Sequence, residues 1–269
     1  MVDYALLDSG NGRKLEKFGP YTLDRPAAQA VWKPKLSKSQ WQQADLFFTR
    51  EGKYAWKRRS NVPDEWQITI DSLKFQMQLT DFGHLGIFPE QIPLWKWIQS
   101  RITRPMRVLN LFAYSGGATL AAAQAGAEVC HLDASKGMVA WARENAALNQ
   151  LDKAPIRWIV DDVNKFLLRE LNRKRQYDAI ILDPPSFGRG AKGEIFKIEH
   201  HLNPLLDQCR SLLTVTPAFI LFSCHTPGFT PTTMQLLLEQ LNLPKGKIEV
   251  GEMLLEETLP SGVYGRWFS

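Results

Sequence analysis

The chain of 269 residues is poor in cysteine and has no long apolar run. Its three cysteines are widely spaced and odd in number, which excludes a disulfide framework and a cysteine-rich metal site. The longest apolar runs have the length of strands, so no transmembrane segment is expected. The N-terminus lacks the basic and then apolar pattern of a secretion signal. We therefore expect a reduced, cytoplasmic protein without a membrane span.

Histidine is also scarce, with five residues, and none of them has the spacing of metal ligands. His200 and His201 are adjacent and would point to different sides of a helix. We expect no metal. Charge is nearly balanced, with a net charge of +5, and most of the excess lies in residues 1–80. A mildly basic segment suits a polyanionic partner, although many proteins without such a partner share this composition.

Residues 1–80 show no helical periodicity and consist of short runs of strand-forming residues separated by Gly, Pro, Asp and Asn. This pattern predicts a small β-rich domain. Four tryptophans lie among lysines and arginines in this segment, and exposed aromatic rings beside basic groups can stack on bases. The alternative, which we favour, is that the tryptophans form the core of the domain. They are Trp32, Trp41, Trp56 and Trp66.

After a loop-like join at Asp81–Gln91, the second domain, residues 81–269, alternates strands with helices. This alternation predicts a parallel sheet covered on both faces. The expected helices are Leu94–Thr103, Ala118–Ala125, Ser135–Leu148, Val163–Asn172, Ile198–Leu213 and Thr232–Leu241. The expected strands are Met106–Phe112, Ala127–Leu132, Ile156–Val160, Ala179–Leu182, Ala218–Cys224 and a closing pair, Lys247–Leu255 and Gly265–Phe268.

The segment Met106–Asp133 reads as strand, glycine turn, helix and strand, with Ser115-Gly116-Gly117 in the turn. Such a unit places backbone N–H groups and a helix N-terminus beside a ligand, and the acid that closes its second strand can hold a ribose. The third glycine of the dinucleotide fingerprint is absent, and no P-loop lysine follows. The segment therefore predicts a nucleoside site.

Other predicted strands also end in polar groups, namely Asp161-Asp162, Asp183-Pro184-Pro185 and Ser223-Cys224-His225. Ligands of open α/β sheets lie beyond the carboxyl ends of the strands. Two successive prolines remove two N–H donors and make the turn rigid, so Asp183 is expected to face the cleft, where Phe187 can stack on a base. A simple helix-stopping turn is the alternative.

These motifs together resemble the bacterial ribosomal RNA large-subunit methyltransferase family, which contains 5-methylcytosine and 7-methylguanine enzymes. The resemblance covers roughly residues 80–225. It implies a Rossmann-like class I methyltransferase sheet, mostly parallel with an antiparallel last strand, preceded by a small N-terminal β-rich domain. It also implies S-adenosylmethionine as cofactor and RNA, favouring ribosomal RNA, as a single-stranded or flipped-out target. No PUA domain is evident, and Ser186 separates the prolines from the aromatic residue, so the modified atom stays open.

The resemblance also implies the site residues. The methionine part would lie against Phe112, Tyr114 and Gly116, the ribose against Asp133, and the adenine against Asp162. The full set of cofactor residues is Phe88, Gln91, Asn110, Phe112, Ala113, Tyr114, Gly116, Asp133, Ala134, Asp162 and Asp183. The catalytic set is Asp183, Pro184, Phe187 and Cys224.

Cys224 has two interpretations. Methylation of carbon 5 of cytosine needs a thiolate that attacks carbon 6, and His225 beside it can lower the pKa of a thiol. Free cysteine is also among the most buried residue types, so we favour a core thiol, as for Cys130 and Cys209.

Three other functions stay open. The chain can be a methyltransferase for a protein or small molecule, with residues 1–80 as a lid. It can be a nicotinamide-dependent oxidoreductase, which the missing third glycine and the Asp-Pro-Pro turn oppose. It can also be a non-catalytic RNA-binding module, which the complete motif series opposes.

Overall fold

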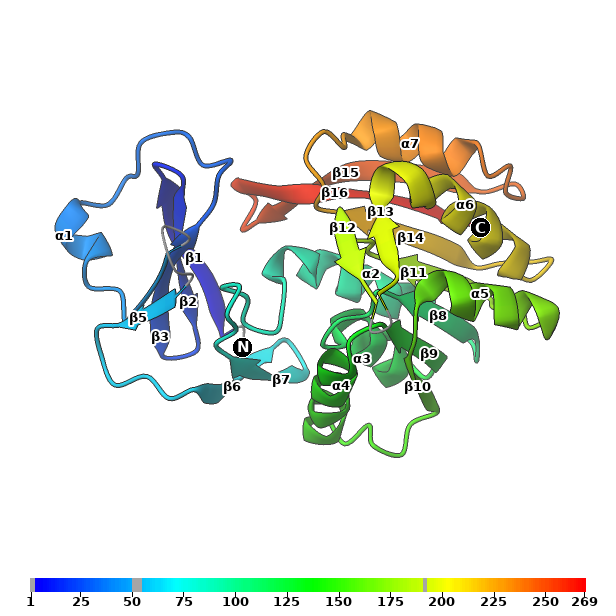
Figure 1. Cartoon of the computed structure of the whole chain (residues 1–269), viewed down its shortest axis with the longest axis horizontal. Helices are drawn as coiled ribbons and strands as arrows, with labels where there is room; N and C mark the ends of the chain where they lie inside the picture. The colour runs from blue at the N-terminus through cyan, green and yellow to red at the C-terminus, as the bar shows by residue number, and fades with distance from the viewer. Residues whose placement is uncertain (1–2, 50–54, 191–192) are drawn as a thin grey trace. The chain divides into compact units, whose positions relative to one another are not determined.

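The structure is a computed structural model that describes residues 3–49, 55–190 and 193–269. It divides into two compact units (Figure 1). The first contains Met1–Glu90 and Leu254–Ser261, and the second contains Gln91–Met253 and Gly262–Ser269. Among the described residues, no helix has the length and apolar character needed to cross a membrane.

The first unit is β-rich, as predicted. Its five-stranded sheet has the order β1-β2-β3-β4-β5, in which β3 and β4 are parallel and the other neighbours antiparallel. A separate hairpin joins β6 to β7. The elements are β1 (Tyr4–Gly10), β2 (Arg13–Phe18), β3 (Tyr21–Pro26), α1 (Lys38–Trp41), β4 (Leu46–Thr49), β5 (Ala55–Arg58), β6 (Glu65–Ile70) and β7 (Leu73–Gln78).

Tryptophans of this unit are tied into its own structure. The indole N–H of Trp41 donates to Asp8 Oδ2 at 3.0 Å, that of Trp56 to the Thr80 carbonyl at 2.8 Å, and that of Trp66 to the Phe18 carbonyl at 3.2 Å. Trp66 is buried with 8% exposed, whereas Trp32 is 41% exposed. The core interpretation therefore holds for Trp66, and Trp32 remains a surface ring.

The second unit is built on a seven-stranded sheet with the order β10-β9-β8-β11-β14-β16-β15. The first five of these strands are parallel, and β16 is antiparallel to β14. The predicted mostly parallel sheet with an antiparallel last strand is confirmed. Its strands are β8 (Arg107–Leu111), β9 (Glu128–Asp133), β10 (Ile156–Val160), β11 (Ala179–Leu182), β14 (Phe219–Cys224), β15 (Lys247–Leu255) and β16 (Leu259–Phe268).

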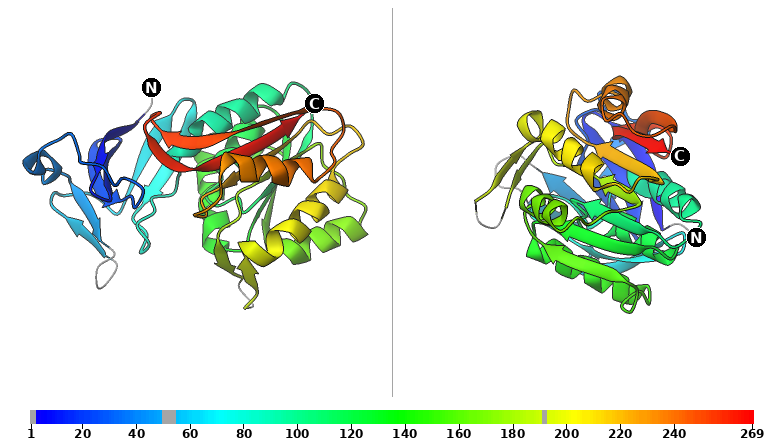
Figure 2. Two further views of the ribbon diagram at one scale, coloured as in Figure 1. Left: turned by 90° about the horizontal axis from the view of Figure 1, so that it is seen from above. Right: turned by 90° about the vertical axis from the view of Figure 1, so that its right-hand side faces the viewer.

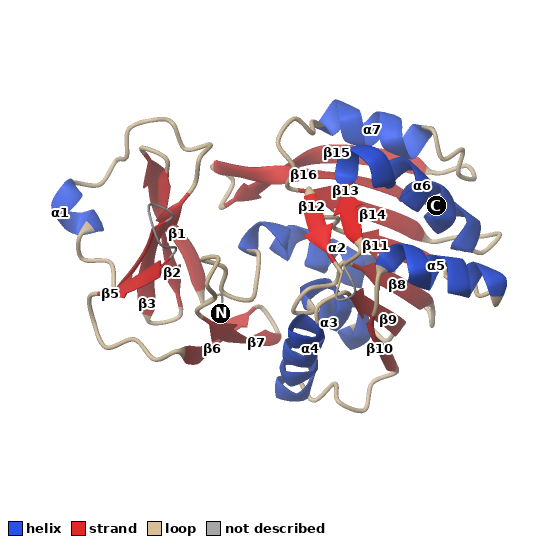
Figure 3. Ribbon diagram, viewed as in Figure 1, coloured by secondary structure: helices blue, strands red, loops and turns tan. Residues whose placement is uncertain are grey.

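Helices cover both faces of this sheet (Figures 2 and 3). Helices α2, α3 and α4 lie on one face and α5, α6 and α7 on the other, as right-handed crossovers require. The central strands are buried on both sides, so their sequences are largely apolar, with Asn110 of β8 as a buried polar exception. The helices are η1 (Pro89–Gln91), α2 (Ile92–Arg101), α3 (Gly117–Gln124), α4 (Lys136–Leu148), α5 (Val163–Asn172), α6 (Ile198–Leu212) and α7 (Pro231–Glu239).

The sequence pattern did not predict one supersecondary element of the second unit. A small hairpin of β12 (Phe187–Arg189) and β13 (Ile195–Lys197) follows the Asp-Pro-Pro turn. Each strand has three residues, which is too short for a period-two pattern, and glycines separate them. Phe187, which we expected in the cleft after the rigid Asp-Pro-Pro turn, lies on strand β12.

Candidate active site

The register of the parallel strands brings the predicted site residues to one edge of the sheet. Leu182 at the end of β11 pairs with Leu111 of β8 and with Phe222 of β14, and Leu111 pairs with Leu132 of β9. The residues that follow these strand ends are thus neighbours across the sheet. The strand order reverses between β8 and β11, which is the position where open α/β sheets bind ligands.

The turn after β8 has an unusual backbone. Phe112 and Tyr114 have positive φ angles of 55° and 51°, and Gly116, the N-cap of α3, has φ of 93°. Strained residues of this kind persist where the surroundings hold them, often at binding sites. A Cβ on Gly116 would lie 3.1 Å from Cβ of Ala142, so only glycine fits without displacing α4. We call the turn Phe112–Gly116 the cradle; its left-handed backbone packs closely against α4.

Asp133, at the end of β9, supports this turn. Its Oδ2 accepts a hydrogen bond from the Tyr114 N–H and its Oδ1 from the Ser135 N–H, both at 2.9 Å. Burial raises the pKa of the Asp133 carboxyl, while these two hydrogen bonds oppose the rise. Ala134, between Asp133 and Ser135, is half-buried. A carboxylate oxygen has more than one acceptor site, so Asp133 can hold the turn and still accept from a ribose hydroxyl.

Asp162, at the end of β10, caps helix α5. Its Oδ1 accepts from the Lys165 N–H at 3.1 Å, and its own N–H donates to Asp161 Oδ1 at 2.9 Å. The structural role of an N-cap is thus present at a residue that we also expected to reach the adenine. The cap uses one carboxylate oxygen.

Asn110 and Ala113 lie beneath the turn rather than at its surface. Asn110 is 3% exposed, and its Nδ2 donates to Thr119 Oγ1 at 2.9 Å. Thr119 Oγ1 lies in turn 2.9 Å from Nδ1 of His131, which is fully buried. This chain of polar groups links β8, α3 and β9. Asn110, which we expected at the cofactor, therefore supports the turn by linking β8 to α3.

Asp183 contacts side chains from two other segments, Gln91 and His225. Its Oδ2 accepts from Gln91 Nε2 at 2.7 Å, and its Oδ1 lies 3.4 Å from Nδ1 of His225. Burial raises the pKa of this carboxyl, but the charge and hydrogen bond of His225, with hydrogen bonds from Ser223 and Gln91, outweigh it and hold the pKa below its ordinary value. Asp183 is therefore ionised at neutral pH and fixed from two sides.

The residues around Asp183 differ in exposure. Pro184 is buried and Phe187 is 49% exposed, with the Arg189 guanidinium 5.7 Å from the centre of the Phe187 ring. Cys224 is fully buried, and burial raises the pKa of its thiol. Both properties of Cys224 oppose a thiolate and agree with a core thiol.

Gln91 and His225 both contact Asp183. Gln91, which we expected at the cofactor, donates its side-chain amide to Asp183, 92 residues away. His225 was considered only as a neighbour of Cys224, and the structure pairs it with Asp183. The signal for His225 was present, since Ser223-Cys224-His225 closes a strand at the ligand edge. Phe88 belongs to the first unit, where its ring packs edge-on against His84 at 5.3 Å.

A seven-stranded sheet with an antiparallel last strand, a strained glycine turn and acids at the strand ends defines a nucleoside-binding α/β enzyme of the methyltransferase type. The chain belongs to the S-adenosylmethionine-dependent methyltransferase family, whose model matches residues 13–241. Its cofactor is therefore S-adenosylmethionine. The cradle fits this molecule, because a nucleoside needs close backbone approach at Gly116 and an acid such as Asp133.

Solved structures agree with this assignment. An S-adenosylmethionine-dependent methyltransferase from Agrobacterium tumefaciens is 38% identical, with a TM-score of 0.93 over 100% of this chain and 91% of that chain. The methyltransferase SMU.776, complexed with S-adenosylhomocysteine, has a TM-score of 0.80 at 20% identity over 99% of this chain and 75% of that chain, and shows the shared fold.

Curated relatives are named ribosomal RNA large subunit methyltransferase K/L. The protein from Pseudoalteromonas atlantica is 33% identical over 64% of this chain, and that from Hahella chejuensis is 31% identical over 67%. The match spans only 22% and 24% of the length of these two relatives. Their substrates are therefore a guide for a proposal about this chain.

Proposed function

We propose that this methyltransferase modifies a base of RNA, and that the RNA is ribosomal. The proposal rests on the Asp183-Pro184-Pro185 turn, where an ionised carboxylate is held between Gln91 and His225 beside the nucleoside cradle. The names of the curated relatives point to the same substrate. These relatives come from bacteria, whose ribosomes are assembled in the cytoplasm, so the proposal includes that location.

In this proposal the cradle holds the cofactor. The turn Phe112–Gly116 contacts the methionine part, Asp133 accepts from the ribose hydroxyls, and Asp162 accepts from the adenine amino group. Bound S-adenosylmethionine supplies an activated methyl group on a sulfonium. The protein then has to align the accepting atom of the base with that methyl group, and alignment of this kind is worth about 7–11 kcal/mol.

Asp183 and its partners act on the base. Its carboxylate orients an N–H group of the base, and the rigid prolines keep the carboxylate in place. In its neutral form, with Nδ1–H directed at Asp183, His225 is positioned to accept a proton at Nε2 where the methylated atom loses one, in the manner of an oriented imidazole base. The exposed ring of Phe187 is available for stacking.

The base must leave its helix to reach such a site, so the target is single-stranded or flipped out. We assign RNA binding outside the site to the basic N-terminal domain, residues 1–80, and methyl transfer to residues 81–269. Net positive charge and an exposed Trp32 support this division of labour.

The test is transfer of labelled methyl from S-adenosylmethionine into total RNA of cells that lack the protein. Label in RNA with wild type and none with Asp183→Asn supports the proposal, and digestion to nucleosides names the base. If wild type binds the cofactor and labels proteins or metabolites but no RNA, the RNA proposal is wrong.

A further inference from the structure

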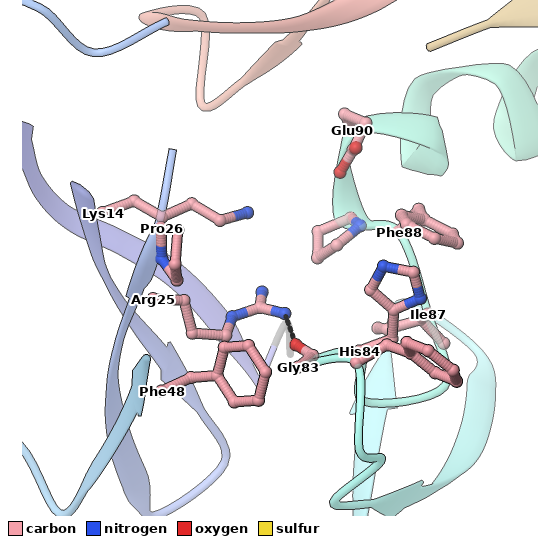
Figure 4. Close-up of a pocket in the computed structure, with 11 residues that line it drawn as sticks. Lys14, Arg25, Pro26, Phe48, Gly83, His84, Ile87, Phe88 and Glu90 are labelled. Atoms are coloured by element: carbon pink, nitrogen blue, oxygen red, sulfur yellow. Dashed lines mark hydrogen bonds between the residues drawn. The ribbon is translucent and has the colours of Figure 1, made fainter. Parts of the chain in front are cut away.

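A cavity of about 130 Å³ lies within the first unit, away from the residues discussed so far except Phe88. One wall comes from β2, β3 and β4 and the other from the segment Phe82–Glu90 (Figure 4). We call it the Arg25 pocket. Gly83 allows the segment to approach the sheet, since its φ is +81° and a Cβ there would lie 2.6 Å from the Phe48 ring.

The sheet side of the pocket is cationic. Glu16, fully buried, accepts from Arg25 Nε at 2.8 Å and from the Tyr4 hydroxyl at 3.1 Å, and it pairs with Lys14 Nζ at 3.1 Å. Arg25 is 7% exposed, and its Nη1 donates to the Gly83 carbonyl at 3.0 Å. Two cations thus share one carboxylate, and each carries further N–H donors. Figure 4 shows both side chains directed into the pocket.

The opposite wall carries an acid. Glu90 is 5% exposed, and its carboxylate turns toward the cavity (Figure 4). Burying charged groups on facing walls is costly unless each meets hydrogen-bonding partners. Simple anions such as phosphate suit Lys14 and Arg25 but are repelled by Glu90. The walls instead match a neutral, polar ligand that offers acceptors on one side and an amino donor on the other.

The aromatic rings that line the pocket and the volume of the cavity restrict which ligands can bind. Phe48, His84 and Phe88 line the pocket, and Phe82 at its rim is 70% exposed. Such rings suit a planar ligand, as in proteins that stack unpaired bases. A cavity of about 150 Å³ accommodates benzene, so the volume here fits one six-membered ring. Purines have a second ring that would extend outside.

We propose that the Arg25 pocket binds one unpaired cytosine of the RNA. Oxygen 2 and nitrogen 3 of cytosine accept from Lys14 and Arg25, and its 4-amino group donates to Glu90. Uracil presents a carbonyl oxygen at position 4, which would face the carboxylate of Glu90. The inference rests on the proposed function, because it treats this base as part of the RNA substrate; it does not require this base to be the one methylated.

The test uses the full chain with ¹³C-labelled isoleucine methyl groups, without cofactor or RNA. Ile87 lines the pocket and is 3% exposed, so its methyl signal, identified with Ile87→Val, reports occupancy. Cytidine, uridine, guanosine and adenosine monophosphates are titrated separately, with inorganic phosphate as a control. We expect a saturable shift with cytidine monophosphate, at a dissociation constant about tenfold below that for uridine monophosphate.

Two variants test the contribution of each wall of the pocket to nucleotide binding. Glu90→Gln places an amide donor opposite position 4, so the preference for cytidine over uridine monophosphate should fall but stay above unity, because nitrogen 3 of uracil carries a proton and cannot accept from Lys14 or Arg25. Lys14→Met should weaken both nucleotides by a similar factor, because it removes a donor to oxygen 2, which both bases carry. Unchanged isoleucine signals remote from the pocket show that each variant is folded.

Absence of an Ile87 shift with every nucleotide, an equal shift with inorganic phosphate, or a preference for uridine or a purine would overturn the pocket assignment. These outcomes are independent of methyl transfer. Cytidine binding by a protein that labels no RNA would reject the proposed function and leave the pocket in place. Labelled RNA without cytidine binding would reject only the pocket.

Discussion

Asp183 and His225 face one another at 3.4 Å, from Oδ1 of the carboxylate to Nδ1 of the imidazole, at the ends of the adjacent strands β11 and β14. Gln91 holds the other carboxylate oxygen at 2.7 Å. The hydrogen bond from Gln91 and the nearby His225 imidazole favour one orientation of the carboxylate. The Asp183 carboxylate is therefore oriented before the substrate binds, and catalysis by positioning depends on such preorganisation.

Asp183→Asn should retain the cofactor and lose methyl transfer. The amide has nearly the same volume but removes the charge that supports His225 and one acceptor for the base. We expect kcat for RNA methylation to fall by about 10²–10⁴-fold, while calorimetry shows S-adenosylmethionine binding within a few-fold of wild type. A large loss of cofactor affinity would instead place Asp183 at the cofactor.

Cys224→Ala should remain active. The thiol is buried, and burial raises its pKa, so a thiolate is disfavoured in the folded protein. We expect methyl transfer within about threefold of wild type and a loss of stability of about 1 kcal/mol. Cys209→Ala, at another fully buried thiol, is the matched control. Complete loss of activity in Cys224→Ala alone, with the fold intact, would establish a nucleophile and direct attention to carbon 5 of cytosine.

Gly116→Ala should weaken cofactor binding. Alanine at a φ of 93° costs about 1–2 kcal/mol, and the new methyl group would lie 3.1 Å from Cβ of Ala142 and shift the cradle. We expect the dissociation constant for S-adenosylmethionine to rise about tenfold or more. Gly126→Ala is the control, because Gly126 has a φ of 94° but no atom within 4 Å of the added carbon. Gly126→Ala should lose stability and keep its affinity for S-adenosylmethionine. An equal loss of this affinity in both variants would mean that the turn at Gly116 does not form the cofactor site.

Elements with local signals were predictable from the sequence. The strand Ile156–Val160 and the helix Val163–Asn172 have the predicted bounds, because an apolar run and an N-capping Asp162 mark them. Ser135, the first residue of the predicted helix Ser135–Leu148, caps α4 and accepts from the Met138 N–H at 3.3 Å. Each of these signals lies within a few residues of the structure that it specifies.

Relations between distant residues were not predictable in this way. No local pattern shows that Gln91 reaches Asp183 or that the Arg25 guanidinium donates to the Gly83 carbonyl, since these contacts arise only when the sheets assemble. The family resemblance placed Asp183 at the site but did not describe what holds it. His225 shows the same limit. In the sequence it stands next to Cys224 and was interpreted through that residue, whereas in the structure its imidazole faces Asp183.

His131 should make the stability of the protein depend on pH in the weakly acidic range. Burial, with a smaller effect of the Arg143 charge, lowers the pKa of His131 to about 3. The unfolded chain binds this proton near pH 6.5 and the folded one does not. Stability is therefore unaffected by His131 above that pH, and falls as the pH drops from about 6.5 toward 3, by up to about 1.4 kcal/mol per unit.

The measurement is denaturant unfolding between pH 7 and pH 4 for wild type and His131→Asn. Asparagine can still meet Thr119 Oγ1 but does not titrate, so its curve should be flatter by the slope that His131 contributes, whatever its stability at pH 7. Parallel curves for wild type and His131→Asn would mean that His131 takes up its proton in the folded state, and the polar chain from Asn110 to His131 would then carry a charge beneath the cradle.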